Sequence, residues 1–267
     1  MAKKGNDISL LLGLGIGLGG ILIGYILEGG KPAALIGVSA LIIVSGGMAG
    51  ALTVSFGIQG LLGLPKILGA AMKPGGGPSP KNVELLCEYS EKARKDGILS
   101  LEDIIDELED PILKKGLRLV VDGTESEVIS TILENDIYVY EAKAKEQAAV
   151  MDAAGGFCPT MGIIGTVTGL VLVLGNLGGD ASALGHSIAS AFIATLYGIG
   201  FANILFLPAG TNLKGKIKRE KLGMEMTIMG VLAIQQGESP ALVKEKIIGF
   251  LEEKEQKELE ASAGGGE

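Results

Sequence analysis

Hydroxyl groups, and not charges, are the chemically interesting side chains in the most apolar parts of this sequence. Four long runs, at residues 8–27, 33–64, 153–179 and 181–213, contain no Asp, Glu, Lys or Arg. An ionisable group inside a membrane span is costly, and a protein that moves ions by itself usually keeps one there. Any ion path through these runs would therefore have to borrow its carboxylate from a partner protein.

Five hydroxyls in the third and fourth runs could line a hydrated path: Thr166, Thr168, Ser187, Ser190 and Thr195. Thr166 and Thr195 fall at broadly similar depth if the two runs form an antiparallel pair of helices. A threonine in a membrane helix also commonly bonds to its own backbone, which is the simpler explanation of these residues. The sequence leaves both interpretations open.

Enzymatic chemistry is not indicated. The chain has no nucleophile paired with a base, no HExxH and no Walker motif, and its Gly-rich stretch at residues 13–17 follows no strand. His186 is the only histidine and lies near the end of the fourth run, either as an interface residue or as a proton relay. Cys87 and Cys158 are far apart without metal-binding spacing, which favours small buried hydrophobic residues. We expect no enzyme activity, cofactor or bound metal.

Each uncharged run is long enough to cross a bilayer as a helix, because about 20 residues at 1.5 Å each span the hydrocarbon core. The second run is longer than one bilayer, so we expect a span over residues 33–56 and an interfacial stretch that turns at Pro65. Pro159 is expected to open the third span and Pro208 to close the fourth. Proline at either place could kink or hinge the helix, or simply mark its end.

The basic residues predict the orientation. Of the 23 Lys and Arg residues, only Lys31 falls in a loop on the far side of the membrane. The positive-inside rule then places both termini and both polar segments in the cytoplasm. Lys3 and Lys4 precede the first run as in a signal peptide, but the run is long for one and no small-residue cleavage site closes it.

The polar segments are expected to be helical. Apolar residues recur at helical spacing, as in Val83 and Leu86, and Asp122-Gly123 marks a turn. Thr124 is expected to cap the next helix, with Glu127 completing a capping box. The net charge of −8 and the lack of a basic patch interleaved with aromatics exclude a nucleic-acid partner.

The predicted fold is therefore all-α: a polytopic membrane protein with four transmembrane helices and a helical cytoplasmic domain. Its expected parts are residues 1–66 (helices 1 and 2), 67–151 (cytoplasmic domain), 152–213 (helices 3 and 4) and 214–267 (cytoplasmic tail).

Several motifs in this order resemble the A subunits of the bacterial flagellar stator, MotA and PomA, within the wider family of ExbB and TolQ. In the membrane runs they are CPTMGIIGT at 158–166, ATLYG at 194–198 and FLPA at 206–209. In the polar segments they are ARKDG at 93–97 with LE at 101–102, LVVDG at 119–123 and GVLAIQQG at 230–237. The polar-segment motifs are those that separate stator A subunits from ExbB and TolQ.

The resemblance implies that five A subunits, a homopentamer, surround two B subunits (MotB- or PomB-like) in the bacterial inner membrane. Each B subunit carries one intramembrane Asp, and ion flow at that Asp turns the pentamer and drives the rotor's switch-ring protein FliG. Arg94, Lys95, Glu102 and Asp103 would form the rotor interface.

By the same resemblance, Pro159 and Pro208 would couple ion flow to conformational change, and Thr166 and Thr195 would lie on the ion path. Proton-type members often carry Ala at the first threonine position, so the resemblance favours Na⁺ over H⁺ as the transported ion. Two departures weaken parts of this reading: Gly156 stands where sodium-type relatives commonly have Asp, and Ala241 where relatives often have a basic residue.

Two other functions remain open. An energiser of outer-membrane transport, like ExbB or TolQ, would share the spans but use a different partner. A structural membrane scaffold would have the same hydropathy and no ion flux.

Overall fold

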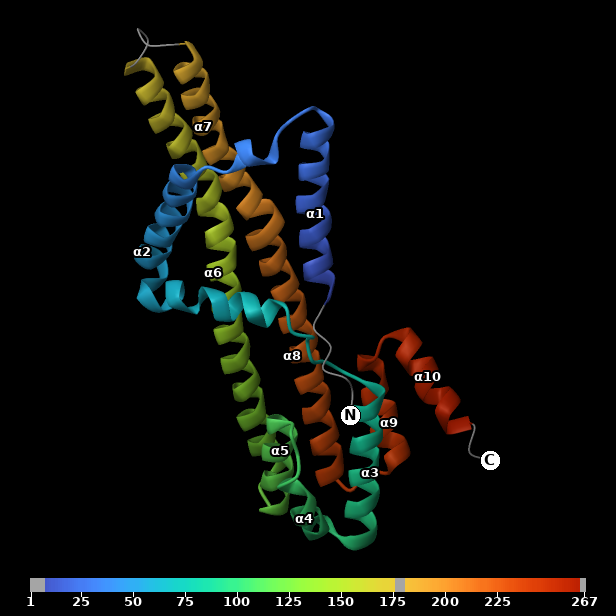
Figure 1. Cartoon of the computed structure of the whole chain (residues 1–267). Coiled ribbons are helices and arrows are strands. Elements are labelled where there is room, and N and C mark those ends of the chain that lie inside the picture. Colours follow the sequence, from blue (N-terminus) through green and yellow to red (C-terminus); the bar gives the residue numbers. More distant parts are fainter. Residues whose placement is uncertain (1–7, 176–180, 265–267) are drawn as a thin grey trace. The chain divides into compact units, whose positions relative to one another are not determined.

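The structure is a computed structural model that describes residues 8–175 and 181–264, and these ranges contain helices and no strand (Figure 1). The helices are α1 (Ile8–Leu27), α2 (Val38–Ala71), α3 (Pro80–Asp96), α4 (Glu102–Ile105), α5 (Pro111–Val121), α6 (Ser126–Gly175), α7 (Ala181–Gly200), α8 (Leu207–Gln235), α9 (Pro240–Ile247) and α10 (Glu253–Gly264). Short 3-10 turns cover Pro32–Leu35, Ile98–Leu101 and Ile248–Phe250, and a π-helical turn covers Phe201–Phe206.

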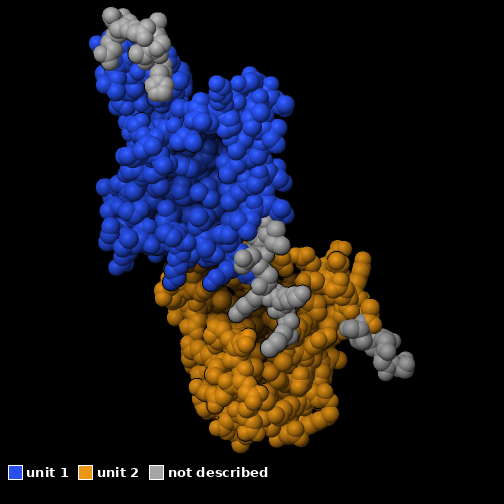
Figure 2. Space-filling view, in the orientation of Figure 1, with its two compact units in different colours: residues 1–74, 145–214 blue, residues 75–144, 215–267 orange. Residues whose placement is uncertain are grey.

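Four of these helical segments are long and apolar enough to cross a membrane: Ser9–Leu27, Pro32–Ala71, Ser126–Gly175 and Ser187–Gln235. The prediction of an all-α polytopic membrane protein is confirmed. The chain separates into two compact units, one of residues 1–74 and 145–214 and one of residues 75–144 and 215–267 (Figure 2). The first unit holds the uncharged runs and is called the apolar unit below. The second is called the polar unit.

Helix α2 turns at Gly57 and not at Pro65, so the expectation for Pro65 was wrong. Gly57 has φ 69° and ψ 176°, a conformation essentially reserved for glycine, and the helix changes direction there (Figure 1). Pro65 lies inside the helical stretch after this bend, which continues to Ala71. The bend therefore depends on the absence of a side chain at Gly57. The helix tolerates Pro65, although proline has no N–H to donate.

Neither Pro159 nor Pro208 ends a helix. Pro159 lies inside α6, which runs without interruption from Ser126 to Gly175. Pro208 is the second residue of α8, directly after the π-helical turn, and α8 continues to Gln235. Of the interpretations left open by the sequence, the one in which each proline marks the end of its helix is therefore wrong. That Pro159 opens the third span and Pro208 closes the fourth stays a prediction. The wide turn before Pro208 absorbs the missing backbone hydrogen bond and lets the helix continue.

The polar unit has a core built from α3, α5, α6, α8 and α9. Val83, Leu86, Leu117, Ile129 and Leu133 are each at most 1% exposed. The helical spacing recognised in the sequence thus marks the buried faces.

The expected capping box at Thr124 does not form, because α6 begins only at Ser126. Thr124 instead completes the end of α5: its N–H donates to the Leu119 carbonyl, and the N–H of Gly123 donates to Val120. Gly123 has φ +74°, so this is the glycine-dependent termination of a helix. The predicted turn at Asp122-Gly123 is present.

Candidate functional site

The structure brings Thr166 of α6 and Thr195 of α7 into direct contact. Their Oγ1 atoms lie 2.5 Å apart, and both side chains are half-buried. Thr166 Oγ1 also lies 3.1 Å from the Gly162 carbonyl oxygen in its own helix and 3.0 Å from the Ala191 carbonyl oxygen of α7. Thr166 therefore bonds its own backbone, as the simpler interpretation expected, and also joins two helices.

Glycine makes this contact possible. A Cβ on Gly162 would lie 2.8 Å from the Ala194 carbonyl oxygen, and one on Gly198 would lie 2.5 Å from the Cys158 carbonyl oxygen. The same closeness holds at Gly165, where a Cβ would meet Ala194 at 2.6 Å. Small residues let membrane helices approach to backbone contact. The seam between α6 and α7 is thus too tight for an ion to pass directly between these two helices.

Tyr197 fixes α7 against the beginning of α2. Its hydroxyl donates to the Leu35 carbonyl oxygen at 2.7 Å and accepts the N–H of Gly37 at 3.0 Å. Its ring stacks on Phe201 with centroids 5.9 Å apart. Tyr197, two residues after Thr195 in α7, thereby satisfies backbone groups at the start of α2. Sequence analysis noted Tyr197 only within a motif, and nothing in the sequence indicated its partners.

An ion pair joins α6 and α8 within the apolar unit. Lys214 Nζ lies 2.5 Å from Asp152 Oδ2, and Asp152 Oδ1 lies 2.9 Å from the position that a Cβ on Gly210 would occupy. The pair is partly exposed. Nothing in the sequence indicates this pairing.

The predicted rotor-interface residues lie around one turn of the polar unit. Arg94 and Lys95 end α3, Glu102 and Asp103 begin α4, and all four are exposed. The chain reverses between them at Gly97, where φ is +84°.

One charge of this group is already paired, since Lys95 Nζ lies 2.5 Å from Glu91 Oε1. That hydrogen bond raises the pKa of Lys95 and lowers the pKa of Glu91. Both groups thus stay charged at neutral pH, and Arg94 remains as the second cation beside the acidic start of α4.

Comparison with known proteins identifies the family. The model of the MotA/TolQ/ExbB proton channel family matches residues 104–226. Motility protein A of Borreliella burgdorferi is 36% identical over 97% of this chain and 99% of its own length. The chain belongs to this family. Chemotaxis protein PomA of Vibrio alginolyticus is 32% identical over 92% of this chain and 96% of its own length.

Solved structures agree with this family membership. A structure described as C. jejuni MotAB has a TM-score of 0.87 at 32% identity and covers 92% of this chain and 96% of its own. The flagellar MotAB stator complex from Bacillus subtilis has a TM-score of 0.86 at 30% identity over 93% of this chain and 98% of its own. The fold of this MotA-family chain is therefore that of proteins solved as MotAB complexes.

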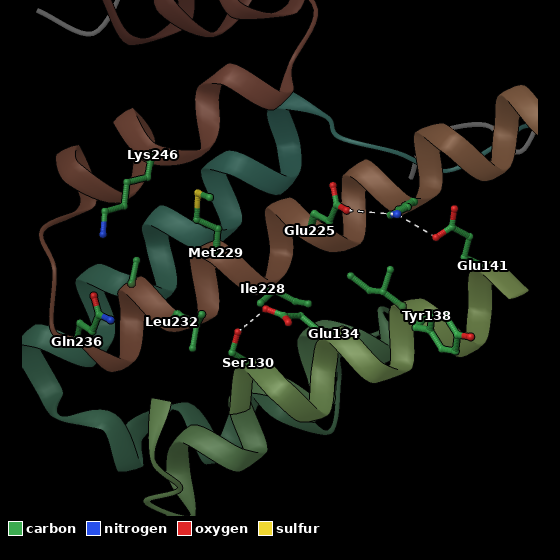
Figure 3. A pocket seen from close by; sticks show the side chains of 13 residues that line it. Ser130, Glu134, Tyr138, Glu141, Glu225, Ile228, Met229, Leu232, Gln236 and Lys246 are labelled. Carbon is green, nitrogen blue, oxygen red and sulfur yellow. Dashed lines mark hydrogen bonds and ion pairs between the residues drawn. The ribbon is translucent and has the colours of Figure 1, made fainter. Parts of the chain in front are cut away.

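The polar unit of this family member contains a groove of about 560 Å³ between α6 and α8 (Figure 3). Ile228, Met229 and Leu232 form an apolar part of its wall. Three of its charged residues pair with one another, since Lys221 Nζ lies 2.9 Å from Glu141 and 3.9 Å from Glu225. In the same wall, Ser130 Oγ donates a hydrogen bond to Glu134 Oε1 at 2.6 Å (Figure 3).

No group of three or more His, Cys, Asp or Glu side chains in the described ranges could hold a metal. Cys87 Sγ donates to the Pro240 carbonyl oxygen at 3.4 Å, and Cys158 is fully buried. The side chain of His186 lies outside the described residues, so neither expectation for it is decided.

Proposed function

We propose that this chain is the A subunit of a bacterial flagellar stator. With a B subunit it conducts ions down their gradient and turns the flux into rotation of the flagellar rotor. The observation that carries the proposal is the contact between Thr166 and Thr195 in spans that have no ionisable side chain of Asp, Glu, Lys or Arg.

The uncharged spans require a partner. The two hydroxyls provide neutral oxygen atoms but no charge, and a permeating cation needs a compensating negative charge in a medium of low dielectric constant. A single-span B subunit with an intramembrane Asp supplies that charge. The similarity to chains solved as MotAB complexes supports this partner. We propose five copies of this chain around two B subunits.

The tight seam between α6 and α7 supports a path on the outside of the subunit. Gly162 and Gly198 bring the helices into backbone contact, so the ion would pass between this chain and the B subunit. Thr166 and Thr195 would share its coordination with the Asp. We propose that Pro159 and Pro208 let α6 and α8 adjust as the Asp is neutralised and recharged.

We propose Na⁺ as the transported ion, with H⁺ as the competing choice. A cation that sheds water needs oxygen ligands in its place, and two adjacent hydroxyls provide them. A proton needs no such ligands. The similarity to PomA adds modest support.

Complementation tests the stator assignment. A strain that lacks its stator should swim again when it expresses this chain together with a cognate B subunit. The same pair with the intramembrane Asp replaced by Asn should assemble but not restore swimming. Failure of the unaltered pair, with both proteins present in the membrane, would contradict the proposal.

The choice of ion is tested by Thr166→Ala, with Thr160→Ala as the matched control. Thr160 is exposed and donates only a local bond to Phe157 in α6. We expect Thr166→Ala to impair swimming most at low sodium and Thr160→Ala to leave it unchanged. Swimming that ignores external sodium and stops with a protonophore would instead assign H⁺.

We propose that Arg94, Lys95, Glu102 and Asp103 contact FliG in the rotor. Arg94→Glu should abolish torque without preventing assembly, and a charge reversal of the facing acidic residue of FliG should restore it. Lys81→Glu, at the other end of α3, is the control and should have little effect. Failure of every reversal in FliG to restore torque would remove Arg94 from the interface.

The ExbB- or TolQ-like function is disfavoured, because the named relatives with near full-length similarity are motility proteins. Capture of the B subunit from membranes distinguishes the two, since a flagellar B subunit carries a peptidoglycan-binding domain. A purely structural scaffold predicts that replacing Thr195 leaves ion flux unchanged.

A further inference from the structure

A second group of hydroxyls faces a pocket of about 200 Å³ between α2, α6 and α7. Ser39 comes from α2, Thr168 from α6, and Ser187 and Ser190 from α7. Most of the remaining wall is small, including Gly165 and Ala191, so the pocket exists because no large side chain fills it. All of these residues belong to the apolar unit.

Hydroxyls on three helices do not suit a space filled by lipid. Thr168 Oγ1 lies 3.0 Å from the carbonyl oxygens of Ile164 and Gly165, so its proton is used within its own helix. Its oxygen keeps two lone pairs, which a hydrocarbon chain cannot satisfy. Water can, and a pocket of this volume holds several molecules that each occupy roughly 30 Å³.

The pocket adjoins the threonine pair. Ala191 lines the pocket, and its carbonyl oxygen lies 3.0 Å from Thr166 Oγ1. Water in the pocket is therefore separated from the pair by the backbone of one residue. The functional prediction from sequence used Thr166 and Thr195 and left Thr168, Ser187 and Ser190 without a role.

We propose that this pocket is a hydrated chamber that admits a partly hydrated monovalent cation beside the Thr166–Thr195 pair. The chamber offers the uncharged hydroxyl oxygens of Ser39, Thr168, Ser187 and Ser190. No carboxylate of the described residues lines it, so it holds a cation only weakly. Conduction needs sites that an ion can both enter and leave. The cation part of this proposal rests on the proposed stator function, while the hydration part does not.

Cysteine labelling tests hydration in the full chain expressed with its B subunit in membranes. A positively charged methanethiosulfonate reagent, added from outside, should modify Ser190→Cys. Ile42→Cys is the matched control: Ile42 is 65% exposed and lies beside Ile43 on α2, but does not line the pocket. It should stay unmodified. The native Cys158 belongs to the same unit and is 0% exposed, so the unaltered chain should give no labelling there.

Modification of Ser190→Cys alone supports a hydrated chamber, even in a complex that does not support swimming. Protection of Ser190→Cys from the charged reagent, together with reaction of a lipid-soluble maleimide, would show a lipid-filled pocket and overturn the proposal.

The cation is tested by the double variant Thr168→Val, Ser190→Ala in a strain that swims with the unaltered pair. We expect the ion concentration for half-maximal swimming speed to rise while the speed at saturating ion is kept. An unchanged concentration dependence would overturn the cation part. Loss of swimming by the unaltered pair would instead contradict the stator function and leave the labelling result standing.

Discussion

At the scale of single residues, the proposed ion path depends on oxygen atoms without charge. Thr166 Oγ1 is within hydrogen-bonding distance of Gly162 O, Ala191 O and Thr195 Oγ1, but it has only one proton to donate. The two hydroxyls can therefore exchange partners without any change in backbone position. On the proposed ion path, the pair would thus be a set of adaptable neutral ligands.

Thr195→Val keeps the shape of the side chain and removes its oxygen. Loss of one hydrogen-bonding oxygen costs about 1 kcal/mol, which corresponds to roughly fivefold in ion occupancy. We expect swimming at limiting ion concentration to fall by a similar factor. Thr195→Ser keeps the oxygen and should retain most of the activity. Equal loss in both variants would assign Thr195 to packing and not to the ion path.

Tyr140 provides a pH-dependent contact outside the membrane. Burial and a hydrogen bond donated to Glu220 raise the pKa of Tyr140 above its ordinary value of 10.0. Because the folded state holds the proton more tightly, this contribution to stability is complete below pH 10 and is lost as the pH rises through the folded-state pKa.

We therefore expect the Tm of the wild type to fall above about pH 10, and Tyr140→Phe to show a shallower fall. Thermal unfolding of purified protein at several alkaline pH values measures the difference. Parallel curves for the two proteins would contradict the prediction.

At the scale of elements, glycine decides how the helices bend and meet. Gly57 creates the bend in α2, and a chain of glycines closes the seam between α6 and α7. In the polar unit, Gly76 and Gly77 contact α8. The N–H of Gly76 donates to Glu220 Oε1 at 3.1 Å. Glu220 thereby links the segment before α3 to Tyr140 of α6.

Gly57→Ala should destabilise the apolar unit by about 1–3 kcal/mol, because alanine does not readily adopt the Gly57 conformation. Gly69→Ala is the control in the same helix, where nothing lies within 4 Å of the added Cβ. It should be neutral or slightly stabilising. The two Tm values in detergent measure the difference, and equal values would show that the bend does not depend on Gly57.

Gly198→Ala should open the seam between α6 and α7. The new Cβ would lie 2.5 Å from the Cys158 carbonyl oxygen, and relief of such overpacking typically costs 1–3 kcal/mol. Gly200→Ala, two residues later, has nothing within 4 Å and serves as the control. We expect a lower Tm and weaker ion-driven motility only for Gly198→Ala. A seam that tolerates alanine would show that the close approach is not required.

At the scale of the whole molecule, two long segments belong to both units. Helix α6 and helix α8 each contribute to the apolar unit and to the polar unit. A change near Thr166 therefore occurs on the same continuous helix that forms the core of the polar unit at Ile129 and Leu133. The proposed coupling of ion flow to the rotor interface would require such a covalent connection, and this continuity provides it.

The distribution of Lys and Arg predicts that both termini face the cytoplasm. A fluorescent protein fused after residue 267 should fluoresce. Alkaline phosphatase, which is active only outside the cytoplasm, should be active when fused after Gly30 and inactive when fused after Gly123. The reverse pattern would contradict the predicted orientation.

Much of the fold was predictable from local patterns. The uncharged runs identified the four membrane-spanning segments, because lipid excludes charged side chains over the whole length of a span. Helical spacing identified the buried faces at Val83 and Leu86, and Asp122-Gly123 marked a turn. The sequence alone was sufficient to predict features that depend on residues within a few positions of each other.

Only the tertiary structure decided which residues meet. The turn was expected at Pro65, whereas the structure places it at Gly57, directly after the expected end of the span at residue 56. Several glycines in α2 could adopt a positive φ, and the sequence does not distinguish among them. For Pro159 and Pro208 the sequence left open a kink, a hinge or a helix end, and the structure shows that neither ends a helix, because neighbouring turns can compensate for a missing N–H. The contact between Thr166 and Thr195, the anchoring by Tyr197 and the hydroxyl pocket depend on how far α6 and α7 rotate about their axes. That rotation is set by glycine contacts between the two helices, which hydropathy and spacing along one chain do not contain.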